Sequence, residues 1–403
     1  MQKTVSLFLT LVICACNFVA LPLGTPTVGK QFTPTANATA ETSPQTSSAP
    51  TTQENQAPIG STRNCLQIEK GTPEDIVLQG RIVTKANDSN KLVVFPPDEY
   101  FSNELSNIYG NAVLGISPDS QWLVYELDDT PENFITIAGF SSITDTRWTT
   151  QIPAIARDIS HWTYWMDDER LVFNIYLENP IVVNMFTGEM EDVDVRHTEF
   201  YLDDSPTILL SRSLDRVIAY RNLPEEPPSI VLWDLPSKTE LWRIYITTEV
   251  AIRILTQTSP TGEKIAVSGS LEPFVDPIFL DLFLVDWDGN VMQLTTLRDA
   301  GLTTSLIEQI QWSPNGRYLA FWLNEFLAVY DTTTQVVTDY CVRTSDSMSF
   351  SPHWSPNSQQ IVFNGDAPPP GSGPIIVVDI VKGSAVEIQE NGYYVEGWMS
   401  DMR

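Results

Sequence analysis

The stretch QWSPNGRYLAFWL, residues 311–323, combines a turn with two apolar flanks. Proline presets φ for a turn, and the Asn315-Gly316 pair that follows it tolerates the left-handed conformations of tight turns. The residues from Tyr318 onward are apolar without interruption, which is typical of a strand covered on both faces. We therefore expect a hairpin between two buried strands, with no nucleophile or base in it.

The same pattern recurs along the chain at intervals of 42 to 54 residues. A period of 40–50 residues built of strands and turns indicates a β-propeller, an all-β fold whose blades are four-stranded sheets. The other copies are GISPDSQWLVYEL (115–127), YWMDDERLVFNIY (164–176), LSRSLDRVIAYRN (210–222), QTSPTGEKIAVSG (257–269) and HWSPNSQQIVFNG (353–365).

The two ends of the repeat region predict one further blade. Residues 76–84 and 91–95 resemble a second and a third strand, and 99–105 a fourth. The C-terminal stretch 392–400 resembles a first strand. Strands from both ends would close the ring and leave no open sheet edge between blades. We expect seven blades over residues 63–403, with six blades and extra terminal strands as the alternative.

Two copies carry a resemblance to a known family. WSPNGRYLAF and LFLVDWDGNVMQLT (282–295) resemble the repeat of TolB-like propellers, also called the WD40-like PD40 repeat, and the resemblance covers about residues 76–403. Trp233-Asp234 matches the dipeptide of true WD40 repeats, but their Gly-His is missing. The resemblance implies an exported propeller that binds proteins or peptides at one mouth of its channel, and it does not imply catalysis.

The N-terminus is typical of an export signal over residues 1–16. Lys3 is followed by an apolar run too short to span a bilayer. Ile13-Cys14-Ala15-Cys16 resembles the bacterial lipobox, which implies cleavage before Cys16 and lipidation of its thiol; ordinary secretion is the alternative. Residues 17–62 are rich in Thr, Ser, Pro and Ala, so we expect a disordered stalk. The domain would then be anchored by lipid on the extracytoplasmic side.

Cys65 and Cys341 lie in the exported part of the chain, where disulfides persist. A bridge between them would tie the segment after the stalk to a distant part of the domain. Two free buried thiols are the alternative.

The charge balance excludes one class of partner. The chain has 51 Asp and Glu against 23 Lys and Arg, a formal charge of −28, which repels phosphate backbones. We expect no nucleic-acid partner. The remaining candidates are protein or peptide partners, and the charge favours cationic ones. We also expect the protein to be a monomer that contacts the membrane only through its lipid.

No sequence motif indicates a metal or a cofactor, and we expect none. Asp286 to Asn290 begins like a calcium loop, but Leu297 stands where that loop needs a glutamate, so a hairpin turn is favoured. The three histidines, His161, His197 and His353, are dispersed. His161 and His353 precede a Trp on predicted innermost strands, where they would face the channel or, as we expect, pack between blades.

Long acidic loops gather on one predicted face. Connections from the second to the third strand lie on the same face as those between blades, and the long variable loops are nearly all of these kinds. Insertions on one face of a repeat protein commonly mark its binding face; acids that only maintain solubility are the alternative. The candidate partner-binding residues are Asp128, Asp129, Glu132, Asp203, Asp204, Glu225, Glu226, Glu272, Asp276 and Asp366.

Three functions are consistent with this sequence. The favoured one is a lipid-anchored propeller that binds a protein, peptide or other ligand. The second is a propeller enzyme, such as a glycosidase or lyase, with carboxylates at the channel mouth. The third is a structural or sensory envelope ectodomain. The sequence assigns no catalytic residue.

Overall fold

The computed structural model describes the part of the chain that contains the repeats. The described residues are 61–71, 77–87, 91–95, 113–127, 134–144, 146–153, 163–173, 180–195, 208–221, 226–246, 256–271, 280–297, 306–344, 350–366, 373–389 and 392–401. They belong to the second of two units, Ser48–Arg403, and the first unit, Met1–Ser47, contains no described residue. Within the described ranges, no helix has the length and apolar character to cross a bilayer.

The described residues form seven sheets, which we number as blades in chain order. Blade 1 contains β5 (Val113–Ile116), β6 (Trp122–Leu127), β7 (Phe134–Ser141) and β8 (Arg147–Pro153). Blade 2 contains β9 (Thr163–Trp165), β10 (Arg170–Phe173), β11 (Ile181–Asn184) and β12 (Met190–Asp192). Blade 3 contains β13 (Ile208–Leu210), β14 (Arg216–Arg221), β15 (Ser229–Asp234) and β16 (Thr239–Tyr245). Blade 4 contains β17 (Thr256–Thr258), β18 (Lys264–Gly269), β19 (Asp281–Asp286) and β20 (Val291–Gln293).

The remaining three blades involve both ends of the described chain. Blade 5 contains β21 (Ile307–Trp312), β22 (Tyr318–Leu323), β23 (Phe326–Asp331) and β24 (Val336–Arg343). Blade 6 contains β25 (His353–Trp354), β26 (Gln360–Asn364), β27 (Ile375–Asp379) and β28 (Ser384–Gln389). Blade 7 contains β29 (Tyr393–Met399), β3 (Arg81–Ala86) and β4 (Leu92–Phe95). The predicted fourth strand of blade 7, at 99–105, lies outside the described residues.

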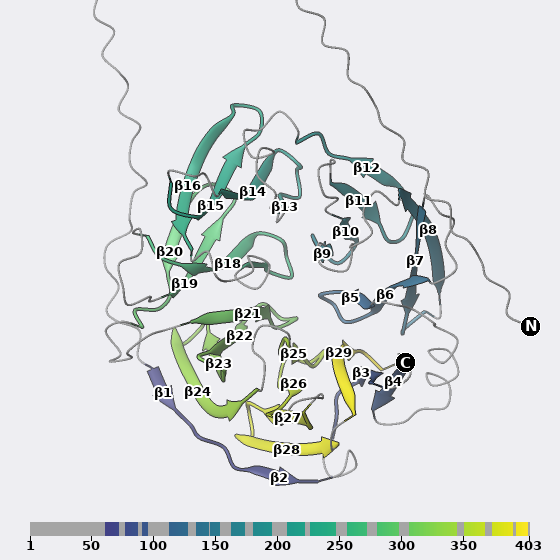
Figure 1. Cartoon of the computed structure of the whole chain (residues 1–403), viewed down its shortest axis with the longest axis vertical. Helices are drawn as coiled ribbons and strands as arrows, with labels where there is room; N and C mark the ends of the chain where they lie inside the picture. Colours follow the sequence, from purple (N-terminus) through teal and green to yellow (C-terminus); the bar gives the residue numbers. More distant parts are fainter. Residues whose placement is uncertain are drawn as a thin grey trace, which may run out of the picture. The chain divides into compact units, whose positions relative to one another are not determined.

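Apolar side chains between the blades close the ring. The described core divides into seven clusters, and each joins two neighbouring blades. Since the last cluster joins blade 7 to blade 1, the blades form a closed propeller (Figure 1). Representative pairs from blade 1–2 to blade 7–1 are Val124 and Phe173, Val172 and Val217, Leu232 and Phe283, Leu284 and Phe321, Trp322 and Phe363, Val377 and Trp398, and Phe140 and Val83.

The prediction that strands from both termini complete one blade is confirmed. β29 pairs antiparallel with β3, so the ring has seven blades and the six-bladed alternative is wrong. The predicted strand at 76–84 begins later than expected, at Arg81. The reason is Gly80, whose φ is 111° and whose α-carbon passes so close to the Met399 carbonyl that a side chain would collide with it.

The opening motif is a structural unit of the blade. Ser313 Oγ accepts the backbone N–H of Tyr318 at 2.8 Å and donates to Asn315 Oδ1 at 2.8 Å, which closes the turn between the first two strands. The indole N–H of Trp354 donates to the Gln311 carbonyl of the preceding blade at 3.0 Å. The turn serine accepts the equivalent backbone N–H at Ser117, Ser211, Ser259 and Ser355.

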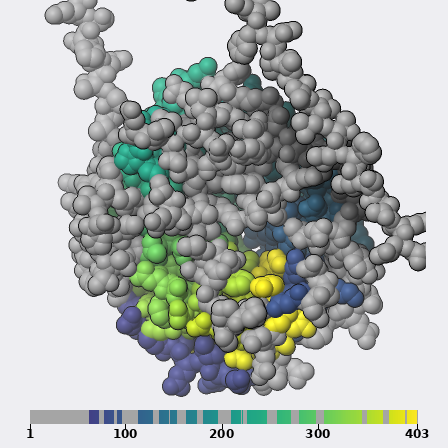
Figure 2. Space-filling model, viewed as in Figure 1, coloured from purple at the N-terminus to yellow at the C-terminus, as the bar shows by residue number. Residues whose placement is uncertain are grey.

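A strap of residues 61–71, which the sequence did not predict, runs along the outside of blades 5 and 6. Its strand β1 (Ser61–Arg63) pairs parallel with β24, and β2 (Ile68–Lys70) pairs parallel with β28. The strap, in purple, lies outside the green and yellow blades (Figure 2). Between the two strands, Cys65 forms a disulfide with Cys341 of β24, their Cα atoms 4.8 Å apart. Of the two thiol states left open by the sequence, the structure has the bridge.

Candidate functional site

The two faces of the propeller differ in the length of their connections. In blades 1–6, the turns from strand one to two and from three to four all have four or five residues. The connections from strand two to three have between two and eleven residues. We call the first face the turn face and the second the loop face. The predicted gathering of long loops on one face agrees with these strand bounds.

Two of the predicted partner-binding residues are described, and both are paired with arginines. Glu226 accepts hydrogen bonds from Arg243 at 2.8 Å and Arg221 at 3.0 Å, which lower the pKa of its carboxyl. Asp366 lies 3.5 Å from Arg343. These two carboxylates are therefore partly neutralised within the chain. The other eight, outside the described residues, are Asp128, Asp129, Glu132, Asp203, Asp204, Glu225, Glu272 and Asp276.

The innermost strands bring a second group of side chains together. The first strand of each blade is innermost, as the contacts of β5 with β9, β21 with β25 and β29 with β5 show. The chain enters each of these strands from the loop face, so the residues at their starts lie near the channel mouth on that face. We call the group on β21, β25 and β29, or just before β25, the inner-strand cluster, which comprises Gln309, Phe350, Ser351, His353, Tyr394 and Glu396.

Contacts within the inner-strand cluster link three consecutive blades. Ser351 Oγ lies 2.6 Å from Gln309 Oε1, which joins the segment before β25 to blade 5. The ring of Phe350 stacks on that of Tyr394 in blade 7, with centroids 5.6 Å apart and an interplanar angle of 22°. The cluster thus brings together an amide, a hydroxyl and a half-exposed aromatic pair from three consecutive blades.

Two members of the cluster occupy irregular positions in their strands. Gln309 has φ 52° within a register shift of β21. Glu396 falls between Val395 and Gly397, which pair with consecutive residues of β3, so Glu396 is the extra residue of a bulge. Bulges re-aim side chains and occur often beside functional sites. In a regular strand, successive side chains point alternately toward one neighbouring blade and the other. The two irregularities remove Gln309 and Glu396 from this alternation.

Burial gives Glu396 an unusual acidity. Desolvation raises the pKa of its carboxyl to about 7, and the positive charge of Lys85 opposes this shift. The side chain is half-buried on the innermost strand of blade 7. Near neutral pH the carboxyl therefore exists both as a hydrogen-bond donor and as a carboxylate.

His353 has the opposite shift. It pairs across the sheet with Val362, which belongs to the apolar cluster between blades 6 and 7. Burial lowers the pKa of the imidazole to about 4, so the ring is neutral at pH 7. The position between blades agrees with the expectation for this residue. His161 and His197 lie outside the described residues.

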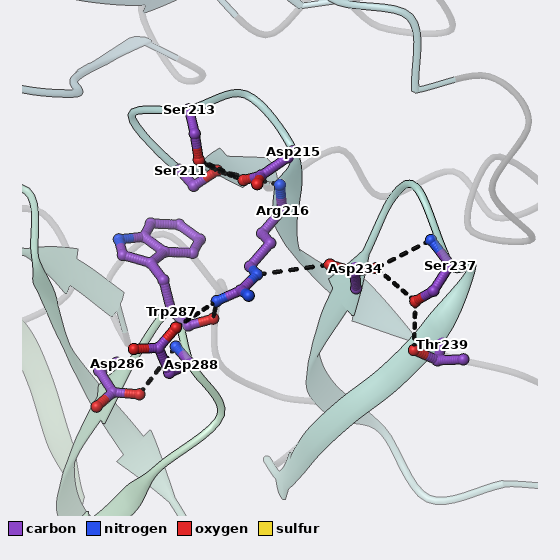
Figure 3. Close-up of polar contacts among 10 residues, drawn as sticks. All are labelled: Ser211, Ser213, Asp215, Arg216, Asp234, Ser237, Thr239, Asp286, Trp287 and Asp288. Atoms are coloured by element: carbon purple, nitrogen blue, oxygen red, sulfur yellow. Dashed lines mark hydrogen bonds and ion pairs between the residues drawn. The ribbon is translucent and has the colours of Figure 1, made fainter.

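The residues that began like a calcium loop form a hairpin turn, as expected. Asp286 Oδ1 accepts the backbone N–H groups of Asp288 at 3.0 Å and Asn290 at 2.9 Å. Arg216 of blade 3 reaches across to this turn of blade 4 and binds Asp288 Oδ1 at 2.8 Å and the Trp287 carbonyl (Figure 3). These acids therefore serve the turn and the junction between blades. Within the described ranges, no three His, Cys, Asp or Glu side chains gather in a way that could hold a metal ion.

The sequence itself could have indicated Glu396 as a candidate functional residue, although loop lengths alone do not reveal it. It is the one charged residue in the run YYVEGWM, residues 393–399, which is otherwise apolar or aromatic. An acid inside a predicted buried strand needs a local explanation, because burying a charge is costly. Gln309 and Tyr394 carried no comparable signal, since their roles depend on contacts between blades.

Comparison with known proteins identifies no family. No protein-family model matches the sequence, and no curated protein matches it. Among solved structures, TolB from Acinetobacter baumannii is similar at 15% identity with a TM-score of 0.41, over 70% of this chain and 67% of that one. An oligogalacturonate lyase in complex with manganese is similar at 12% identity with a TM-score of 0.45, over 80% and 86%.

A second oligogalacturonate lyase, from Vibrio parahaemolyticus, is similar at 11% identity with a TM-score of 0.45, over 78% of this chain and 85% of that one. The similarity stops at the fold. At these identities and scores it transfers no substrate, metal or partner to this chain. Any function must therefore rest on the chain's own residues.

Proposed function

We propose that the chain is an extracytoplasmic, lipid-anchored binding module whose loop face captures a protein or peptide partner. The observation that carries the proposal is the difference between the faces: uniform short turns on one, and connections of two to eleven residues on the other. Variation in loop length costs a repeat protein little stability when the loops lie on the surface. Such loops commonly carry the binding residues.

The inner-strand cluster supports the same face. Its hydroxyl, amide and stacked rings lie on innermost strands or just before them, where the chain arrives from the loop face. A peptide that lies across the loops can place one side chain over this mouth. The net charge of −28 favours a cationic partner, because opposite charge accelerates encounter.

A charge-reversal experiment tests the loop face. The full-length chain would be immobilised and incubated with detergent-extracted envelope proteins, and bound partners would be quantified by mass spectrometry. Asp128→Lys with Asp129→Lys is the informative variant. We expect at least tenfold weaker capture, equivalent to about 1.4 kcal/mol. Glu226 is a poor choice, because its loss would also leave Arg221 and Arg243 without their partner.

The matched control reverses two exposed acids on the turn face, Glu189 and Glu263, with the same change in net charge. We expect capture by this variant to be unchanged. Equal loss in both variants would favour the alternative that acids only set solubility and general attraction. Full capture by the loop-face variant would exclude this face as the binding surface.

The membrane attachment has its own test. Mass spectrometry of the mature N-terminus is expected to find an acylated cysteine at Cys16. The variant Cys16→Ser is expected to move the protein from the membrane fraction to the soluble fraction. A mature N-terminus located after Cys16 would instead indicate ordinary secretion.

One observation favours an enzyme as the second candidate. A carboxyl whose pKa is raised to about 7 by burial can act as a general acid near neutral pH. Incubation of the protein with panels of neutral and uronic oligosaccharides, followed by detection of new reducing ends or unsaturated products, tests this. Turnover that disappears in Glu396→Gln would support the enzyme, and no turnover would favour the binding module.

A further inference from the structure

The strap is held to the ring chiefly by backbone pairing along two sheet edges. Three residues of β1 pair with β24, and three residues of β2 pair with β28. Between and beyond them, Asn64 and Leu66 donate backbone N–H groups to the Asp339 and Tyr340 carbonyls, and Gly71 donates to that of Glu387.

The side chains of the strap add little to this pairing. Nearly all of them are exposed, and Leu66 is the strap residue that packs against a described inter-blade cluster. Arg63 pairs with Asp339 and Lys70 with Glu387, but the two basic side chains are 74% and 76% exposed. Exposed ion pairs contribute little stability. The conformational entropy that the strap loses when it becomes ordered opposes its attachment and offsets part of the stability from these contacts.

The ring does not depend on the strap for its closure. The chain is attached to the ring again just after it, where Leu78 packs in the cluster between blades 6 and 7 and the Val77 carbonyl accepts the Gln360 Nε2–H at 3.3 Å. Closure itself is made by β3 with β29, further along the chain than the strap. Residues 61–71 can therefore leave the sheet edges while all seven inter-blade clusters remain.

Apart from the chain itself, which continues into the ring after residue 71, the disulfide is the covalent bond that holds the described strap on blade 5. It joins residues 276 apart in sequence, and Cys65 is exposed while Cys341 is half-buried on the edge strand. We propose that this disulfide is a redox clasp: its reduction releases the strap from blades 5 and 6 and leaves the propeller folded. This inference does not depend on the proposed function.

The chemistry requires a dithiol as reductant. One of its thiolates attacks the exposed Cys65 sulfur, and Cys341 leaves as a thiolate that takes up a proton. The second thiol of the reductant then attacks its own sulfur in the mixed disulfide, which frees Cys65 as a thiol and leaves the reductant as a disulfide. Two electrons pass to the protein. Release uncovers the edges of β24 and β28, with their carboxylates Asp339 and Glu387.

Limited trypsin digestion of the full-length chain tests the clasp, because Lys70 lies within β2. The cleavage rate after Lys70 would be followed by mass spectrometry with and without dithiothreitol. We expect it to rise at least tenfold on reduction, since proteolysis reports the population of the open form. Near-UV circular dichroism of the ring should be unchanged. Cys65→Ser, which alters only the exposed strap, should be cleaved rapidly without reductant.

Lys238 and Lys264, exposed residues of blades 3 and 4 that the strap does not pair with, serve as internal controls. Their cleavage rates should not respond to reduction. If the rate after Lys70 is the same in the oxidised, reduced and Cys65→Ser proteins, non-covalent contacts hold the strap and the proposal is wrong. If cleavage after Lys238 and Lys264 rises together with that after Lys70, the disulfide stabilises the whole ring, which also overturns the proposal.

Discussion

Glu396 and His353 show how burial acts in opposite directions on an acid and a base. Both lie on innermost strands of neighbouring blades, and in both desolvation disfavours the charged form. The acid therefore holds its proton to higher pH, and the base loses its proton at lower pH. Each shift makes the stability of the protein depend on pH in a separate window.

For Glu396, stability is lost as pH rises. The ordinary pKa is 4.5 and the folded value about 7, so between these values the folded state binds more protons than the unfolded state. The loss reaches about 3 kcal/mol above pH 7. Glu396→Gln should therefore be more stable than the native chain at pH 8 by up to this amount, and equal to it at pH 4. Urea unfolding at both pH values measures this, and a difference independent of pH would contradict it.

For His353, stability is lost as pH falls from 6.5 to about 4, because the unfolded state takes up a proton that the folded state refuses. The imidazole proton resonances of His353 should stay at their neutral positions from pH 7 to pH 5. Nuclear magnetic resonance titration measures this, and the spectrum of His353→Gln identifies the signal. A midpoint near 6.5 would mean that the ring is solvated.

At the scale of the element, the turn between the first two strands of a blade is a repeated structural unit that depends on a buried serine. Its serine oxygen is fully buried in Ser313 and Ser355, where it accepts one backbone N–H and donates to the asparagine two residues on. Because this hydroxyl has no water to replace its partners, the turn depends on it.

Ser313→Ala should destabilise the protein by about 1–3 kcal/mol, because the Tyr318 N–H loses the Ser313 Oγ acceptor and Asn315 Oδ1 loses a donor. Chemical denaturation followed by tryptophan fluorescence measures the change. Ser384→Ala, at an exposed position at the start of β28, is the control and should change stability by less than about 0.5 kcal/mol. Equal effects would mean that the buried hydroxyl has no special role.

The sequence predicts elements well where an uninterrupted apolar run is bounded by turn residues, as in a strand covered on both faces. The stretch 311–323 forms the expected hairpin of β21 and β22, and 392–400 contains β29 as the expected closing strand. The start of β3 was placed too early, because the bend at Gly80 depends on the Met399 backbone, which is distant in sequence. The strap was missed because its short, exposed strands carry no apolar periodicity.

The candidate site was less predictable than the fold. Loop length could be inferred from sequence, because turn residues mark the strand ends. The pairing of Glu226 with Arg221 and Arg243 could not, since Glu226 lies in the connection after β14, which ends at Arg221, whereas Arg243 lies on β16. The inner-strand cluster depends on which residues meet across blades 5, 6 and 7, and no local pattern contains that information.

At the scale of the whole molecule, stability depends on closure by β29. This strand supplies the buried Trp398 to the cluster between blades 6 and 7 and Met399 to that between blades 7 and 1. Deletion of residues 393–403 should abolish cooperative thermal unfolding, because two inter-blade clusters lose members and β3 loses its partner. Circular dichroism melting curves measure this.

Deletion of residues 1–60 is the matching control, and it should leave the melting temperature of the oxidised protein within about 2 °C of that of the full chain, because it removes none of the described contacts. A cooperative transition that survives the C-terminal deletion would show that six blades suffice for a stable ring.

The pairing of Arg81–Ala86 with Tyr393–Met399 also sets an order of events during biogenesis. β3 must wait for β29 to be synthesised, because the two strands are separated by nearly the whole domain and such distant pairings form slowly. The ring of a nascent chain therefore stays open until β29 has been made. If the protein is exported as proposed, that delay keeps the chain unfolded enough to pass through the translocation channel, and the propeller closes only after β29 has crossed.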